Sequence, residues 1–219
     1  MEDNILKEIK ACLFPNVGYL ETKLSPGVLK FLKEAIKNKQ VKKSNYNLAG
    51  NIGSSHTIPD KNDWFFKNVL QSCINHYVHH FGPCAQLTLT KNCKYILDSM
   101  WVNYQKKYQF NPIHDHTGVF SFVVWYKIPF SLQNEKKVPF VKHSNNPSAG
   151  CFEFLYTNTL GQIRYKRSSL SSKNEGTMLF FPATLLHQVY PFFTSDKNRI
   201  SISGNISLDP EQIVKHEEN

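Results

Sequence analysis

The hydrophobic pattern changes its period near residue 84, and this change restricts the fold more than any other feature of the chain. From there to residue 208 we predict roughly eight or nine short strands, rich in aromatic and β-branched residues and separated by turn residues. No helical pattern intervenes between them, which is typical of a β-sandwich or barrel and not of an alternating α/β fold. We therefore expect a closed sandwich of the jelly-roll or cupin kind.

The predicted strands are short and end at turn residues such as Asn174-Glu175-Gly176. A polar stretch over 129–150 is expected to be a long loop of the kind that often covers a binding site. The strands are expected at 85–92, 96–105, 112–116, 120–128, 151–157, 163–168, 177–182, 185–191 and 199–207.

Residues 1–83 are predicted to be mostly helical. Ser25-Pro26 provides an N-cap and a proline at the first helical position, and apolar residues follow at helical spacing. A second periodic stretch runs from Trp64 to Phe81 and ends at Gly82-Pro83. We expect this helical lobe to pack on one sheet of an 84–208 core, with 209–219 as a polar tail and one structural domain overall.

The charge balance leaves a polyanionic partner open. The chain carries 26 Lys and Arg against 17 Asp and Glu, a net charge of +9, but only three of the cations are arginines. Lysine-rich and asparagine-rich stretches can also reflect compositional bias, so nucleic-acid binding is an alternative here and not the leading interpretation. No run of about 18 apolar residues is present, and the N-terminus is acidic, so we expect no membrane partner and a cytoplasmic location.

Three histidines suggest a metal site. His114 and His116 are two residues apart, so on an extended strand they point to one face while Asp115 points away. His187 lies in an apolar run, where a buried ring nitrogen needs a partner. Two imidazoles from one strand and a third from a distant strand can form an open metal site, although hydrogen-bonded histidines remain the alternative.

Arg199 begins a strand of clean alternation. Arg199, Ser201, Ser203 and Asn205 share one face, and isoleucines occupy the other. Such a strand can simply have one face in water. A guanidinium next to hydroxyls can also hold a carboxylate, because its planar fork offers two parallel hydrogen bonds.

The order of these motifs resembles that of the Fe(II)/2-oxoglutarate-dependent oxygenases, and most closely a phage and bacterial branch related to prolyl hydroxylases. The resemblance covers roughly residues 45–208. It depends on Leu48-Ala49-Gly50-Asn51-Ile52, Trp101-Val102-Asn103, His114-Asp115-His116, the apolar strand from Ser121 to Pro129, Phe181-Pro182 before His187, and Arg199-Ile200-Ser201.

The resemblance implies a double-stranded β-helix core and a dioxygenase reaction. Fe(II) would be bound by His114, His116 and His187, and Arg199 with Ser201 would hold the far carboxylate of 2-oxoglutarate. Asn103 and Tyr104, near the site on a predicted strand, are further candidates for contact with 2-oxoglutarate. O2 would be consumed, succinate and CO2 would form, and a C–H bond of the substrate would be hydroxylated.

One departure from the family and three questions stay open. His116 occupies the position that holds a carboxylate in most of the superfamily, so Asp115 is an alternative ligand. The primary substrate is a peptide, a small molecule or, less favoured, a nucleic acid. A cupin-like metal-binding module without turnover and a basic nucleic-acid-associated protein are the alternative functions. If the chain is virus-encoded, the expected location is the host cytoplasm.

Overall fold

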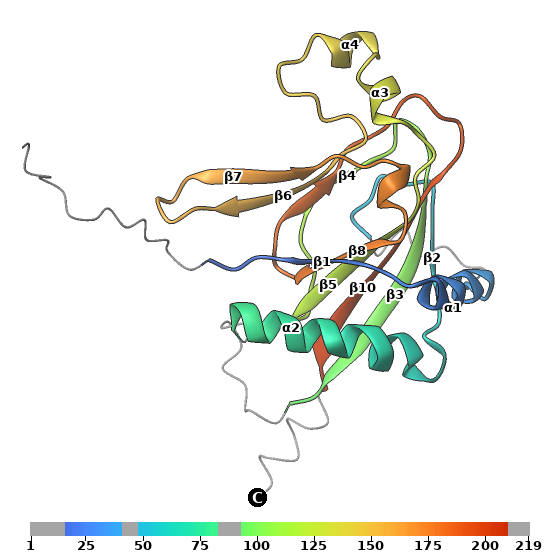
Figure 1. Cartoon of the computed structure of the whole chain (residues 1–219), viewed down its shortest axis with the longest axis vertical. Coiled ribbons are helices and arrows are strands. Elements are labelled where there is room, and N and C mark those ends of the chain that lie inside the picture. Colours follow the sequence, from blue (N-terminus) through green and yellow to red (C-terminus); the bar gives the residue numbers. More distant parts are fainter. Residues whose placement is uncertain (1–15, 41–47, 83–92, 210–219) are drawn as a thin grey trace, which may run out of the picture.

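Two antiparallel sheets face each other in the computed structural model, which describes residues 16–40, 48–82 and 93–209 (Figure 1). The six-stranded sheet has the order β1-β8-β5-β10-β3-β2, and the four-stranded sheet has the order β4-β9-β6-β7. The strands are β1 (Leu20–Lys23), β2 (Ser54–Thr57), β3 (Tyr95–Gln105), β4 (Asn111–His114), β5 (Phe120–Lys127), β6 (Phe152–Thr157), β7 (Ile163–Ser168), β8 (Thr177–Pro182), β9 (His187–Val189) and β10 (Arg199–Leu208).

Most strands lie where the period-two pattern predicts them. β7 and β8 begin and end at the predicted residues, whereas β9 is shorter than the predicted 185–191. The predicted strand at 85–92 falls wholly outside the described residues, as does the tail after Asp209. The apolar strand β5 lies between β8 and β10 and is buried from Phe120 to Trp125, so both of its faces are covered.

The predicted N-terminal helices are present as α1 (Pro26–Lys37) and α2 (Gln71–Phe81), the latter preceded by a π-helical turn, Phe66–Leu70. The Ser25 hydroxyl accepts a hydrogen bond from the Val28 amide at 3.4 Å, as expected of an N-cap. The Asp60 carboxylate accepts hydrogen bonds from the Phe65 and Phe66 amides and thereby fixes the entry to the second helical stretch. No helix among the described residues is long and apolar enough to span a membrane.

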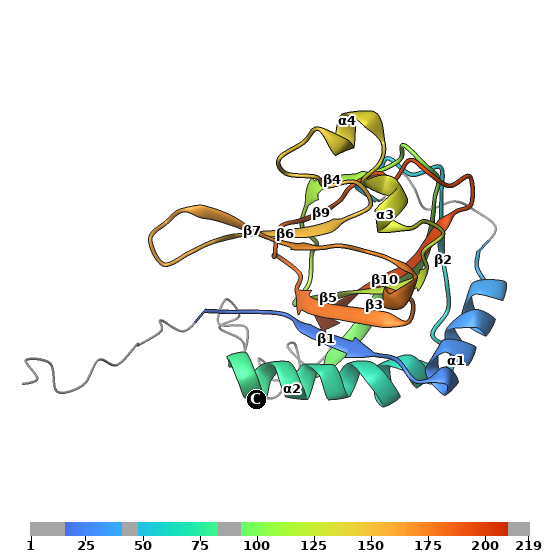
Figure 2. The same ribbon diagram turned by 45° about the horizontal axis from the view of Figure 1, so that its top comes forward.

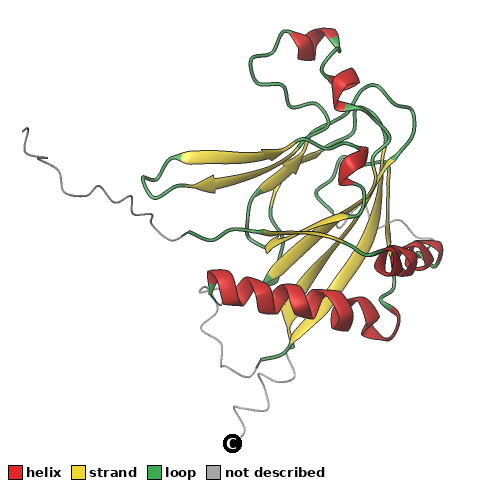
Figure 3. Cartoon of the chain, in the orientation of Figure 1, coloured by secondary structure: helices red, strands yellow, loops and turns green. Residues whose placement is uncertain are grey.

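Both helices cover one face of the six-stranded sheet (Figures 2 and 3). Their buried residues pack in one cluster with inward-facing residues of β3, β5, β8 and β10. A second cluster fills the space between the two sheets, so that each apolar face of the large sheet is buried. This second cluster contains Val123, Trp125, Phe152, Phe154, Leu179, Phe181, Val189 and Phe192.

The N-terminal segment is not only helical. β1 pairs with β8, and β2 pairs with β3, so two short strands that the sequence pattern did not predict extend the large sheet at both edges. The boundary proposed at residue 84 stays a prediction. The long loop over 129–150 contains two single-turn helices, α3 (Leu132–Glu135) and α4 (Pro139–Lys142).

Candidate metal centre

Three histidine side chains converge between the two sheets. His114 at the end of β4 is paired directly with His187 at the start of β9, and their ring centroids lie 4.3 Å apart. His116 lies just beyond β4, where its backbone amide donates to Ala183, and its ring centroid is 5.0 Å from each of the other two. One ring nitrogen from each histidine lies within 4.8 Å of the others. The predicted convergence of these residues is therefore present in the structure.

Backbone carbonyl groups fix the protonation of two of the rings. The Nδ1 atom of His114 lies 2.7 Å from the carbonyl oxygen of Pro112, and Nδ1 of His187 lies 2.8 Å from that of Leu185. A carbonyl oxygen only accepts, so each Nδ1 carries the hydrogen and each Nε2 keeps its lone pair. This is the arrangement in which carbonyl groups orient metal-binding histidines.

Burial favours neutral rings at this site. Desolvation, followed by the charge of His114, lowers the pKa of His187 to about 3. The same two causes lower the pKa of His116 to about 4, although Asp115 acts in the opposite direction. Neutral imidazole is the form that binds metals, so the donor set suits a divalent transition metal ion.

Asp115 is not part of this group. Its residue is exposed, and the cluster of potential metal-binding atoms consists of the three histidines. The alternation of side chains along β4 explains this, because Asp115 follows His114 directly and points to the other side. Gly118 then turns the chain at a φ of 98°, a conformation that favours glycine.

The histidines line a cavity together with polar residues of β3 and β10. Asn103 and Ser201 are paired across these strands and both line the cavity, whereas Tyr104 does not. Successive residues of a strand point to opposite faces, so the Tyr104 ring lies on the helix-covered side, with the Lys39 ammonium 5.9 Å from its centre. The structure thus brings Asn103 and Ser201 to the site and directs Tyr104 away from it.

Arg199 is buried behind the same wall and is 1% exposed. Its guanidinium lies between the rings of Trp125, Phe130 and Phe192, at 5.5 to 5.9 Å from their centres. Burial lowers the pKa of Arg199 to about 9, which leaves the group charged at neutral pH. The polar face of β10 that begins with Arg199 therefore places this charge inside the molecule and not in solvent.

Gln105 and Asn111 also line the cavity, and sequence reasoning did not select them. Gln105 is paired with Arg199 in the register of β3 and β10, and its amide oxygen accepts two hydrogen bonds from the guanidinium. It lies two residues beyond Asn103, so alternation along the predicted strand could have identified it. Asn111 carries a buried side-chain oxygen without a hydrogen-bond partner among the described residues. No sequence signal identifies that atom.

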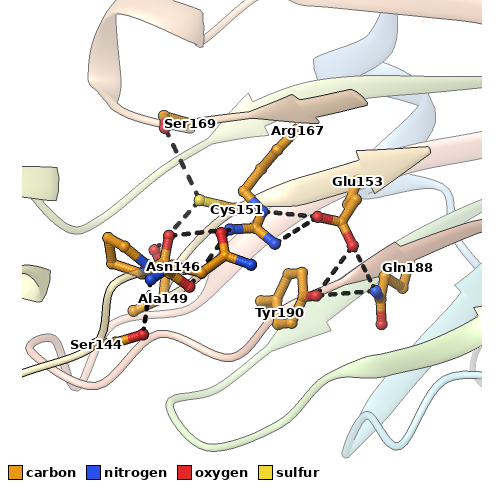
Figure 4. Close-up of polar contacts among 10 residues, drawn as sticks. Ser144, Asn146, Ala149, Cys151, Glu153, Arg167, Ser169, Gln188 and Tyr190 are labelled. Carbon is orange, nitrogen blue, oxygen red and sulfur yellow. Dashed lines mark hydrogen bonds and ion pairs between the residues drawn. The ribbon is translucent and has the colours of Figure 1, made fainter. Parts of the chain in front are cut away.

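A polar cluster outside the cavity supports the backbone that contacts Arg199 (Figure 4). Arg167 forms an ion pair with Glu153 at 2.6 Å and donates to the Asn146 side chain, also at 2.6 Å. Glu153 further accepts hydrogen bonds from Gln188 and Tyr190. We call these five residues the Arg167 cluster. It connects the 144–150 loop to the four-stranded sheet. Gly150 in that loop and Tyr190, directly after β9, supply carbonyl oxygens to the Arg199 guanidinium.

Comparison with known proteins agrees with this architecture. A 2OG-Fe(II) oxygenase family protein from Burkholderia pseudomallei superimposes with a TM-score of 0.54 and 11% identity, over 87% of this chain and 85% of that one. The carbocyclase SnoK from nogalamycin biosynthesis, a non-heme α-ketoglutarate-dependent enzyme, gives 0.51 and 10%, over 88% and 80%. A viral collagen prolyl hydroxylase from Paramecium Bursaria Chlorella virus-1 gives 0.49 and 16%, over 86% and 94%. No curated protein matches the chain.

The fold is thus the predicted double-stranded β-helix with helices packed on one sheet. Residues 99–205 match the family described as "Putative 2OG-Fe(II) oxygenase". This match confirms the resemblance to the 2OG-Fe(II) oxygenases that the motifs predicted. The matched family implies Fe(II), 2-oxoglutarate and O2 as cofactor and cosubstrates.

Proposed function

We propose that the chain is an Fe(II)- and 2-oxoglutarate-dependent dioxygenase that hydroxylates a C–H bond of a peptidyl or small-molecule substrate. The observation that carries the proposal is the convergence of three ring nitrogens within 4.8 Å in a cavity that has a buried arginine behind its wall. A metal centre beside a buried cation suits a ligand that is both a chelator and an anion. 2-Oxoglutarate has these two properties.

His114, His116 and His187 are the proposed iron ligands. Three neutral nitrogens leave the remaining coordination positions of the ion open, as the family chemistry requires. This donor set is less anionic than two histidines with one carboxylate, so we expect weaker retention of Fe(II). Asp115 has no part in the proposed site, because it is exposed and lies outside the cluster.

Arg199 and Ser201 are the proposed anchors for the far carboxylate of 2-oxoglutarate, and Asn103 lines the same wall. The Asn103 side-chain oxygen accepts a hydrogen bond from Ser55 at 2.6 Å, which fixes the orientation of its amide. Bound Fe(II) and 2-oxoglutarate would supply the oxidising power for hydroxylation by O2, with succinate and CO2 as coproducts. Four aromatic side chains line the cavity and would limit the access of water to the reacting groups: Trp101, Trp125, Phe152 and Phe181.

The test is succinate formation from 2-oxoglutarate by the purified protein in air, with and without added Fe(II). We expect iron-dependent succinate, even without the primary substrate, through uncoupled turnover. His187→Ala should abolish it, and Asp115→Ala should not. An anaerobic Fe(II) titration with 2-oxoglutarate should in parallel give a visible charge-transfer band.

The result also separates the alternatives. Metal binding without 2-oxoglutarate binding would indicate a cupin-like metal-binding module and would overturn the proposal. A basic nucleic-acid-associated role predicts binding that falls steeply with salt concentration. The exposed cations Arg164 and Lys166 on β7 are the residues to test for such binding. Charged side chains are also common on an ordinary edge strand that faces solvent, so their presence does not by itself indicate a nucleic-acid partner.

A further inference from the structure

Gln105 lies between the buried arginine and the cavity. Gln105 lines the cavity, whereas Arg199 lies behind it and reaches the cavity wall through this side chain. The two residues are paired in the register of β3 and β10 and are 4% and 1% exposed, respectively. Any cavity ligand that is to contact the guanidinium on this side must therefore meet Gln105.

The amide oxygen of Gln105 occupies the edge of the guanidinium best suited to a carboxylate. Nε and Nη2 of Arg199 form one fork, and both donate to Oε1 of Gln105, at 3.2 and 2.7 Å. On the opposite side, Nη2 donates to the Tyr190 carbonyl at 2.9 Å and Nη1 to the Gly150 carbonyl at 3.2 Å. Those two acceptors belong to the backbone, so the Gln105 side is the edge that a side-chain movement can vacate.

The partners of Arg199 are all neutral. Within the described part of the chain, no carboxylate forms an ion pair with it. Burial lowers the pKa of Arg199, and Glu135, whose charge acts in the opposite direction, accepts hydrogen bonds from the Phe193 and Thr194 amides. A hydrogen bond to a charged acceptor is roughly twice as strong as one to a neutral acceptor. A carboxylate that reached the fork would therefore displace the amide oxygen favourably.

We propose that Gln105 is a placeholder for the far carboxylate of 2-oxoglutarate: its amide oxygen accepts from the Nε and Nη2 fork of Arg199, and it turns aside when the cosubstrate binds. Gln105 thereby sets the affinity for the diacid by competing for the same fork. The Nε2 atom of Gln105 donates to the Gln109 carbonyl, and this hydrogen bond holds the amide in the position from which it would turn aside. This inference rests on the proposed function and adds a residue that determines the choice of cosubstrate.

Two substitutions with opposite expected effects test the proposal. Gln105→Glu has the same size but supplies a permanent carboxylate to the fork, so it should weaken 2-oxoglutarate binding at least about tenfold. Gln105→Met keeps a similar volume but removes the competing acceptor, so it should strengthen that binding. Gln105→Met should also lower the Tm of the ligand-free protein, because the buried Nε donor loses its partner and Nη2 keeps only the Tyr190 carbonyl.

The measurement is calorimetric titration of Ni²⁺-loaded protein, which allows binding without turnover, with 2-oxoglutarate and with pyruvate. Pyruvate has the keto-acid end but no far carboxylate, so its affinity should not change in either variant. Gln162→Glu makes the same chemical change at an exposed residue and should bind 2-oxoglutarate like the wild type.

The outcomes separate this inference from the proposed function. Unchanged 2-oxoglutarate affinity in Gln105→Glu, or weakened affinity in Gln105→Met, would overturn the placeholder role while the oxygenase proposal stands. If Gln105→Glu does not fold, Gln105→Met alone decides by the direction of its change. Wild-type protein that binds Ni²⁺ but neither acid would overturn the proposed function itself.

Discussion

His114 and His187 face each other across the antiparallel pair of β4 and β9, and a backbone carbonyl two residues earlier in the chain orients each ring. The two residues are 73 positions apart (187 − 114) in the sequence. Only the register of the small sheet brings them together, so the candidate metal centre depends on strand pairing as much as on the histidines themselves.

Loss of a histidine should remove the metal ion and leave the fold intact. Loss of a residue that only hydrogen-bonds to a metal ligand typically weakens metal binding roughly 10- to 100-fold. We expect His187→Ala to weaken Fe(II) or Ni²⁺ binding by more than this, because it removes a ligand itself. Competition with a chromophoric chelator measures this change. Asp115→Ala is the matched control, since Asp115 is exposed, and an equal loss in that variant would contradict the three-histidine assignment.

Replacement of Arg199 should affect both stability and cosubstrate binding. Arg199→Lys keeps a charge but cannot satisfy Gln105, Gly150 and Tyr190 together, so we expect a loss of about 2–4 kcal/mol in the free energy of unfolding. The KM for 2-oxoglutarate should rise, and Ni²⁺ affinity should not change. Arg164→Lys on the exposed face of β7 is the control. Its free energy of unfolding, measured by urea denaturation, should be within about 0.5 kcal/mol of the wild-type value.

The Arg167 cluster should show an asymmetry between its two ions. The Glu153 side chain is 4% exposed and that of Arg167 is 15% exposed. Arg167→Met leaves the more deeply buried Glu153 carboxylate without its ion-pair partner and should lower the free energy of unfolding by about 3–5 kcal/mol. Glu153→Gln leaves the Arg167 guanidinium unpaired, and because this group is closer to water, the free energy of unfolding should fall by less. Urea denaturation of both variants, and of the double variant, checks this order, and equal costs would contradict it.

Two glycines with the same backbone preference should respond differently to alanine. Gly118 and Gly161 both have positive φ values, 98° and 76°. A Cβ atom at Gly118 would lie 2.7 Å from the Ile206 carbonyl oxygen, whereas at Gly161 it would meet nothing within 4 Å. Gly161→Ala should cost only the left-handed penalty of about 1–2 kcal/mol. Gly118→Ala should cost more and should also weaken metal binding, because the displaced loop carries His116.

The sequence predicted most of the core because its strands alternate cleanly and end at turn residues. β1 and β2 were missed because four-residue edge strands carry almost no periodic signal, and tertiary pairing decides them. The convergence of the histidines followed from the two-residue spacing, even though His116 lies beyond the end of β4.

Other parts of the site depended on the register of strands, which one sequence does not specify. The ion pair of Arg167 with Glu153 follows from their pairing between β7 and β6. Tyr104 directly follows Asn103, so alternation places it on the helix-covered face once the inner face of β3 is fixed. The same alternation places Gln105 on the inner face with Asn103.

The cavity wall includes Leu48, Ala49, Gly50 and Ile52, which lie some fifty residues before the matched family region begins at residue 99. An excised fragment limited to that region would have all three histidines and Arg199 but would lack this side of the enclosure and the partner strand β2. The smallest unit that encloses this cavity therefore extends well upstream of the segment by which the family is recognised.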